Sequence, residues 1–250
     1  FEIDGELAHE RIAEGIVFGD VFFVAAPSQL PKLTIEDKSS GIVRMMTRKA
    51  KRFSFSRPSR FSVCVSTTPK NRFACEWTEA SGFAAALGHR IGKKTGNPVG
   101  VIFMQSGSGN TPTTVKSWIH PDDLKLAPSL MDDYKDLAAV RPGNEFYDAN
   151  ARRYIAAWKN YWNDYVPKMI ETNSVPDEVP WGTYPTLSGS VTSKASEVYN
   201  VMVESFTPAS LKGAIFLGND QMLENTSDEE ISQQFGALHS SWATRFGDDE

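Results

Sequence analysis

The chain has 250 residues, 40% of them hydrophobic and 23% charged, a composition typical of a globular protein large enough to bury a core. Its formal net charge is −5 and it has no extended basic run, which argues against nucleic-acid binding. No apolar run approaches the ~18 residues of a transmembrane helix, so we expect no membrane span.

Residues 1–18 predict two short strands around Asp4-Gly5, an edge hairpin that we assign to the end of a preceding β region. Residues 19–250 then form the main domain. Three apolar runs without alternation predict strands buried on both faces: residues 19–26, 99–104 and 212–217. A weaker strand is expected at residues 42–46.

Apolar side chains at helical spacing predict four helices between or after these strands: residues 80–94, 145–170, 193–206 and 228–246. We expect the aromatic face of the second helix to lie in the core. Thr226 or Ser227 would cap the last helix. Buried strands separated by helices predict an α/β fold, a three-layer α/β/α domain with a mainly parallel sheet.

Ligands of such sheets bind beyond the carboxyl ends of the strands. Small polar residues follow all three buried strands, and we expect Ser28, the glycine-rich loop at residues 105–112 and Asn219 to surround one cleft. Ser28 is a candidate nucleophile, with an ordinary turn serine as the alternative. We find no metal-binding or nucleotide-binding motif, and therefore expect no metal and no cofactor.

Several segments in order resemble the sialate O-acetylesterase family of the SGNH-hydrolase clan. That family begins its first block roughly G-D-V-W-L-C-S-G-Q-S-N-M, where this chain has GDVFFVAAPSQL, and Ser28 falls on the nucleophile. Similar matches follow in the family's order: Pro98–Ile102 before a glycine-rich loop, Trp118, Tyr199-Asn200, Lys212–Asp220 and Trp242–Gly247. The resemblance implies an SGNH-type, flavodoxin-like fold.

The resemblance also implies serine-esterase chemistry, in which hydrogen-bond donors stabilise the oxyanion of the tetrahedral intermediate. The implied donors are the N–H of Ser28, a loop N–H from Gly107 or Gly109 beside Asn110, and an amide at the end of the third strand. There Asn219 stands where the family has glycine, and Asp220 where it has glutamate. A strand would direct Asn219 to the opposite face.

The family takes its catalytic histidine from an Asp-x-x-His segment, which this chain lacks. We therefore expect the base and its aspartate beyond residue 250. Among the four histidines, His120 is the candidate base, beside Asp122 and Asp123, and a solvated loop histidine is the alternative. The remaining three are expected to be surface or packing residues.

These features predict a carbohydrate O-acetylesterase-like serine hydrolase, secreted or periplasmic, whose substrate is an acetylated carbohydrate or a sialic-acid-like small molecule. The alternative is an inactive relative that serves as a carbohydrate-binding or structural domain of a larger exported protein. Cys64 and Cys75 lie in two short β-like runs, and either a disulfide or two buried thiols fits the pattern.

Overall fold

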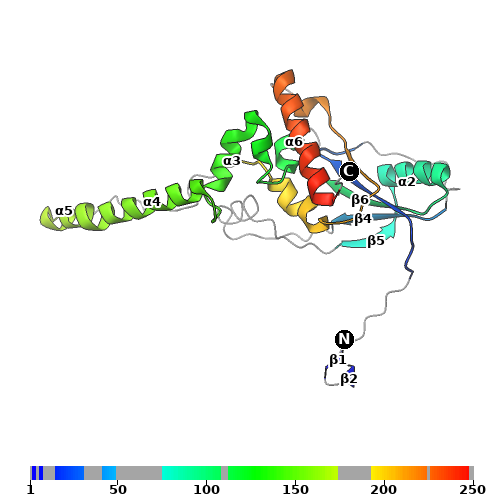
Figure 1. Cartoon of the computed structure of the whole chain (residues 1–250), viewed down its shortest axis with the longest axis horizontal. Coiled ribbons are helices and arrows are strands. Elements are labelled where there is room, and N and C mark those ends of the chain that lie inside the picture. Colours follow the sequence, from blue (N-terminus) through cyan, green and yellow to red (C-terminus); the bar gives the residue numbers. More distant parts are fainter. Residues whose placement is uncertain are drawn as a thin grey trace.

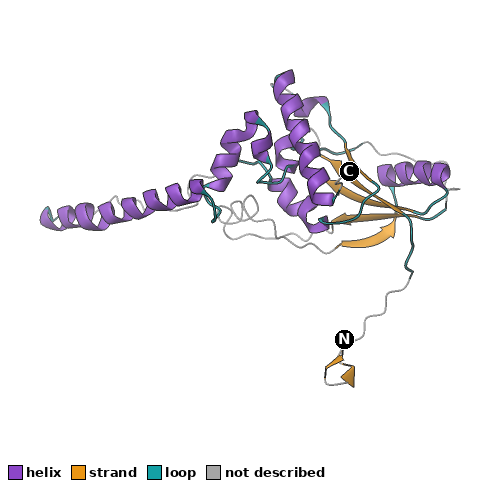
Figure 2. Ribbon diagram, in the orientation of Figure 1, coloured by secondary structure: helices purple, strands orange, loops and turns teal. Residues whose placement is uncertain are grey.

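The computed structural model describes residues 2–3, 6–7, 15–30, 41–48, 75–107, 112–173, 193–223 and 226–247. Five strands form one sheet in the order β5-β4-β6-β3-β7. Their bounds are Asp20–Ala26 (β3), Val43–Arg48 (β4), Cys75–Glu79 (β5), Val99–Gln105 (β6) and Gly213–Phe216 (β7). Every pairing is parallel except that of β5 with β4. The chain therefore has a mixed α/β fold with a mostly parallel sheet (Figures 1 and 2).

Both faces of β3, an interior strand between β6 and β7, are buried, as its unbroken apolar run predicts. Phe23 packs in a cluster that includes Trp242 of helix α6 (Asp228–Phe246). Its neighbour Val24 faces the other way, into a cluster with Ala84 of helix α2 (Gly82–Thr95). Helices thus cover both faces of the sheet, an arrangement compatible with three layers (Figure 1).

Helix α2 comes close to strand β4 at a glycine. A Cβ atom built on Gly88 would lie 2.3 Å from Cγ1 of Val43, so no larger residue fits there without movement of the neighbour. The helix ends at Gly96, whose φ of 75° is in the left-handed region that favours glycine. The close approach explains why a residue without a side chain occupies position 88.

Helix α6 begins with the cap that its sequence predicts. Ser227 Oγ accepts a hydrogen bond from the backbone N–H of Glu230, and the Glu230 carboxylate accepts one from the N–H of Ser227. Three acidic residues in the first turn favour the positive end of the helix dipole. The helix ends at Gly247 in the left-handed conformation.

The expected N-terminal hairpin is present: β1 (Glu2–Ile3) pairs antiparallel with β2 (Glu6–Leu7). It forms a two-stranded sheet of its own, separate from the five-stranded sheet, and its assignment to a preceding β region stays a prediction. Cys64 lies outside the described residues. The disulfide and the two free thiols therefore both stay open.

The expectation that the aromatic helix lies in the core is wrong. Helix α3 (Met131–Ala138) is followed by α4 (Glu145–Asn160), a π-helical turn (Tyr161–Tyr165) and α5 (Val166–Glu171). The last three segments form a long arm that projects from the body and contains no buried residue (Figure 1). Trp162 is 55% exposed. The aromatic rings stack on one another within the arm, as Trp158 does on Trp162.

The expected helix at residues 193–206 is present from residue 197 onward as one continuous helical segment that changes type along its length. A π-helical turn (Tyr199–Val203) and a 3-10 turn (Glu204–Phe206) occupy its second half. Tyr199 and Val203 are fully buried and join the cluster around Phe23. No helix within the described ranges is long and apolar enough to cross a membrane.

Candidate active site

The carboxyl ends of three parallel strands meet at one edge of the sheet. Ala26 of β3 lies opposite Gln105 of β6, and Ala25 lies opposite Phe216 of β7. The pairing continues past β6, because the N–H of Ser106 donates to the carbonyl oxygen of Ala26 at 2.9 Å. The polar segments that follow β3, β6 and β7 therefore leave the sheet at the same edge.

Ser28 and Asn219 lie in direct contact at this edge. The Nδ2 atom of Asn219 donates to Oγ of Ser28 at 3.0 Å. Ser28 is only 6% exposed, and among the described residues Asn219 is the hydrogen-bond partner of its hydroxyl. The expected proximity of these two residues is confirmed, and their chemical roles stay predictions.

The orientation of the Asn219 side chain is set by a turn, which corrects the expectation that a strand would direct it to the opposite face. Strand β7 ends at Phe216, and Asn219 caps the 3-10 turn Asp220–Met222. Its Oδ1 atom accepts a hydrogen bond from the N–H of Met222 at 3.2 Å. Because the amide oxygen is engaged there, the NH₂ group faces Ser28.

The other expected binding residues are only partly described. Gly107 follows β6 with a φ of 86° and is exposed, so it provides the tight turn that leaves the strand. Gly109 and Asn110 lie outside the described residues. Asp220 is exposed, and no hydrogen bond joins its carboxylate to Ser28 or Asn219 in the described part of the chain.

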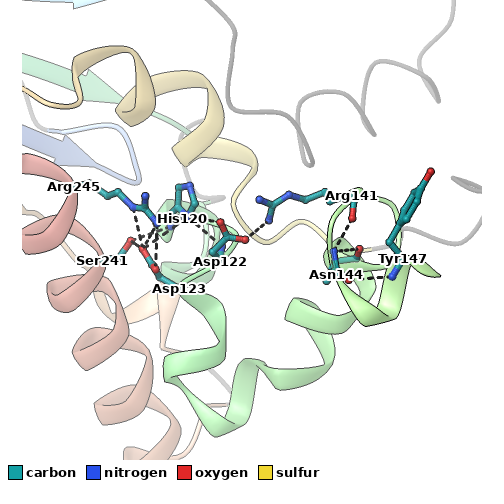
Figure 3. A network of polar contacts seen from close by, with 9 residues as sticks. His120, Asp122, Asp123, Arg141, Asn144, Tyr147, Ser241 and Arg245 are labelled. Carbon is teal, nitrogen blue, oxygen red and sulfur yellow. Dashed lines mark hydrogen bonds and ion pairs between the residues drawn. The ribbon is translucent and has the colours of Figure 1, made fainter. Parts of the chain in front are cut away.

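His120 is neither a solvated loop residue nor a partner of Ser28, which corrects both expectations for it. The residue is only 5% exposed. Its Nδ1 atom accepts a hydrogen bond from the N–H of Asp122 at 3.1 Å and lies 3.0 Å from Nη2 of Arg245 (Figure 3). No hydrogen bond joins His120 to Ser28 among the described residues.

The surroundings of His120 keep its imidazole neutral. Burial, together with the nearby Arg245 guanidinium, lowers the pKa of His120 to about 4, although Asp123 and Asp122 partly oppose the shift. Two donors face Nδ1, so the proton of the neutral ring is on Nε2. Asp123 in turn accepts a hydrogen bond from Ser241 of α6 at 2.8 Å. The contacts of His120 and Asp123 with α6 therefore hold the loop after Trp118 against that helix.

A groove lined by apolar surface together with several polar side chains lies beside the Ser28 turn. It has a volume of about 680 Å³ and is lined by residues that include Gly107, Thr113 and the ion pair of Lys116 with Asp133, whose charged atoms are 2.9 Å apart. Thr113 links the groove to the turn, because its N–H donates to the carbonyl oxygen of Pro27 at 2.9 Å. Hydroxyl and charged groups of this kind suit a polar ligand.

The sequence did not point to Thr113 or Trp118 as part of the site. Both follow the glycine-rich loop, yet nothing in their spacing separates them from ordinary loop and core residues. The signal that could have found Thr113 is the group of threonines at positions 111, 113 and 114, at the end of that loop, because a hydroxyl there can hydrogen-bond to the turn after the neighbouring strand.

No protein-family model, curated protein or solved structure matches the chain. Within the described ranges, no three His, Cys, Asp or Glu side chains lie together in a way that would hold a metal ion. The function must therefore be inferred from the geometry at the sheet edge and from the motifs of the chain itself.

Proposed function

We propose that the chain is a carbohydrate O-acetylesterase-like serine hydrolase of the SGNH type, with Ser28 as the nucleophile. The observation that supports this most is the 3.0 Å hydrogen bond from Asn219 Nδ2 to Ser28 Oγ at the carboxyl edge of a parallel sheet. An amide held beside the nucleophile can donate its second N–H to the carbonyl oxygen of a bound ester. The motif resemblance at both strand ends supports the same assignment.

In the proposed reaction, Ser28 Oγ bonds to the acetyl carbonyl carbon while its proton passes to a base. The carbonyl electron pair moves onto oxygen, where the Asn219 amide and the N–H of Ser28 stabilise the charge. The ester C–O bond then breaks, and the sugar leaves as an alcohol with the proton from the base. Water repeats the sequence on the acetyl-enzyme, releases acetate and restores Ser28.

Among the described residues the Ser28 hydroxyl is hydrogen-bonded to Asn219 and to no base, and the free nitrogen lone pair of His120 is engaged by Asp122 and Arg245, so we expect the base outside the described residues. The same observation favours a second candidate function, a relative that binds acetylated sugars without cleaving them. The two candidates differ in whether the Ser28 hydroxyl is activated.

Hydrolysis of 4-nitrophenyl acetate and of acetylated sugars tests the proposal. We expect Ser28→Ala to reduce the rate to background. Ser129→Ala is the matched control, because the Ser129 hydroxyl oxygen is also buried but has no hydrogen-bond partner among the described residues. We expect it to retain the wild-type rate.

A fluorophosphonate probe gives a second measurement, since it bonds to serines whose hydroxyl is activated. Mass spectrometry should locate the added phosphonyl group on Ser28 of the wild type and find none on Ser28→Ala. A wild type that hydrolyses at the background rate and takes up no probe, yet binds acetylated sugar, would establish the non-catalytic alternative instead.

A further inference from the structure

The turn that carries Ser28 is held by Thr113. The carbonyl oxygen of Pro27 accepts a hydrogen bond from the N–H of Thr113 at 2.9 Å and a longer one from its hydroxyl at 3.4 Å. Pro27 has no N–H, so its carbonyl is the only backbone group through which this residue can be hydrogen-bonded. The position of the peptide that enters Ser28 therefore depends on Thr113.

Thr113 is in turn fixed by Trp118. The indole Nε1 of Trp118 donates to Oγ1 of Thr113 at 2.9 Å, so the threonine hydroxyl both accepts and donates and has one favoured direction. Trp118 is fully buried. Its own carbonyl oxygen accepts a hydrogen bond from Nε1 of Trp242 in α6 at 3.0 Å. Trp118 is thus held by one hydrogen bond through its indole and by another through its backbone.

The same indole also touches the strand that leads to Asn219. The Trp118 ring meets Phe216 edge to face, with ring centroids 5.8 Å apart. Phe216 is the last residue of β7 and lies three residues before Asn219. Trp118 is therefore linked indirectly to both residues of the Ser28–Asn219 pair: to Ser28 through Thr113 and Pro27, and to Asn219 through Phe216.

We propose that Thr113 is a positioning residue that sets the Ser28 hydroxyl against the Asn219 amide, and that Trp118 fixes Thr113 relative to β7. This inference goes beyond the proposed function, because it concerns the geometry of the pair whether or not the pair hydrolyses esters. Only its kinetic consequence rests on that function. Small displacements of a reacting atom reduce turnover strongly, by about a hundredfold for ~1 Å.

The first measurement is the side-chain amide resonance of Asn219 in ¹H–¹⁵N NMR spectra, assigned by its loss in Asn219→Asp. Thr113→Val keeps the shape of the threonine but removes its hydroxyl, and Thr113→Ser keeps the hydroxyl. We expect Thr113→Val to move the Asn219 resonance in the way that Ser28→Ala does. Thr113→Ser should leave it at the wild-type position.

Thr114→Val is the matched control, because the Thr114 hydroxyl makes no hydrogen bond to a described residue and its side chain is exposed. We expect no change in the Asn219 resonance. If Thr113→Val fails to fold, Trp118→Phe serves in its place, since it removes the indole N–H and keeps a ring against Phe216. It should move the same resonance.

The second measurement is kinetic. We expect Thr113→Val to lower kcat for an acetyl ester about ten- to a hundredfold with KM within about twofold, and Thr113→Ser to restore kcat. An unchanged Asn219 resonance in folded Thr113→Val, or a Thr113→Ser variant as impaired as Thr113→Val, would overturn the inference. A wild type without esterase activity would contradict the proposed function only. The Asn219 amide resonance would still test whether Thr113 positions the pair.

Discussion

Arg245 and His120 are in direct contact, with Nη2 of the arginine 3.0 Å from Nδ1 of the buried histidine. The contact is favourable only while the imidazole is neutral and accepts a hydrogen bond. Asp123 lies 3.4 Å from Arg245, and Asp122 pairs with Arg141 at 2.7 Å, so both carboxylates near the ring are also bound to arginines (Figure 3). Protonation of His120 would therefore place a cation against Arg245.

The stability of the protein should fall in mildly acidic solution because of His120. Its pKa is about 4 in the folded state and near its ordinary 6.5 in the unfolded state, so between these values the unfolded chain binds more protons. The stabilisation is complete above pH 6.5 and is lost as the pH falls toward 4, by about 3 kcal/mol at most. The free energy of unfolding, measured by urea denaturation between pH 7 and pH 4, tests this prediction.

The matched variants for this titration are His120→Asn, whose side-chain oxygen can still accept from the N–H of Asp122, and His239→Gln on the exposed side of α6. We expect the pH dependence to weaken in His120→Asn and to persist in His239→Gln. The same pH dependence in both variants would show that other groups cause it.

Gly88→Ala should destabilise the protein, although alanine favours a helix. The added Cβ would meet Cγ1 of Val43 at 2.3 Å, and such overpacking costs about 1–3 kcal/mol. Gly236→Ala is the matched control, because a Cβ there meets no atom within 4 Å and should stabilise α6 by up to about 1 kcal/mol. Thermal unfolding of the two variants measures both changes in stability. Changes of opposite sign would confirm the close approach of α2 to β4, and changes of the same sign would contradict it.

Ser227→Ala should lower the free energy of unfolding by about 1 kcal/mol, because it removes the acceptor for the Glu230 N–H at the start of α6. Ser240→Ala, on an exposed position of the same helix, should change stability by less than about 0.5 kcal/mol. Chemical denaturation of both variants provides the comparison. A smaller loss in Ser227→Ala than in Ser240→Ala would argue against the capping box.

Trp162→Gln should leave the melting temperature nearly unchanged, because this side chain lies on the exposed arm and not in the core. Leu124→Ala, at a fully buried position, should cost about 2–5 kcal/mol. Differential scanning calorimetry of the two variants tests the placement of the arm. Severe destabilisation by Trp162→Gln would contradict the exposed position of the arm and indicate that the aromatic helix packs in the core.

Strands β3 and β6 were predictable because their apolar runs are unbroken, whereas β7, which was also expected to be buried on both faces, is an edge strand with no buried residue. The run around Phe23 and Val24 has no polar face, and only a strand covered on both sides can bury it. The meeting of Ser28 and Asn219 followed from the same logic, since parallel strands end at one edge. The direction of the Asn219 amide did not follow, because it depends on where β7 ends and on the N–H of Met222.

The aromatic arm and His120 could not be predicted for a different reason. Helical periodicity shows that Trp158 and Trp162 share a face but not whether another element covers that face. In the same way, nothing near His120 in the sequence indicates that Arg245, far along the chain, lies beside it. Both outcomes depend on tertiary packing between distant segments.

The bond between Ser28 and Asn219 joins residues 191 positions apart, one after the interior strand β3 and one after the edge strand β7. During synthesis most of the chain has to leave the ribosome before these two groups can meet, because β7, which pairs with β3, lies near the end of the sequence. The contact between Ser28 and Asn219 therefore forms only once the sheet is complete. A fragment that stops short of β7 carries the serine but not its amide partner.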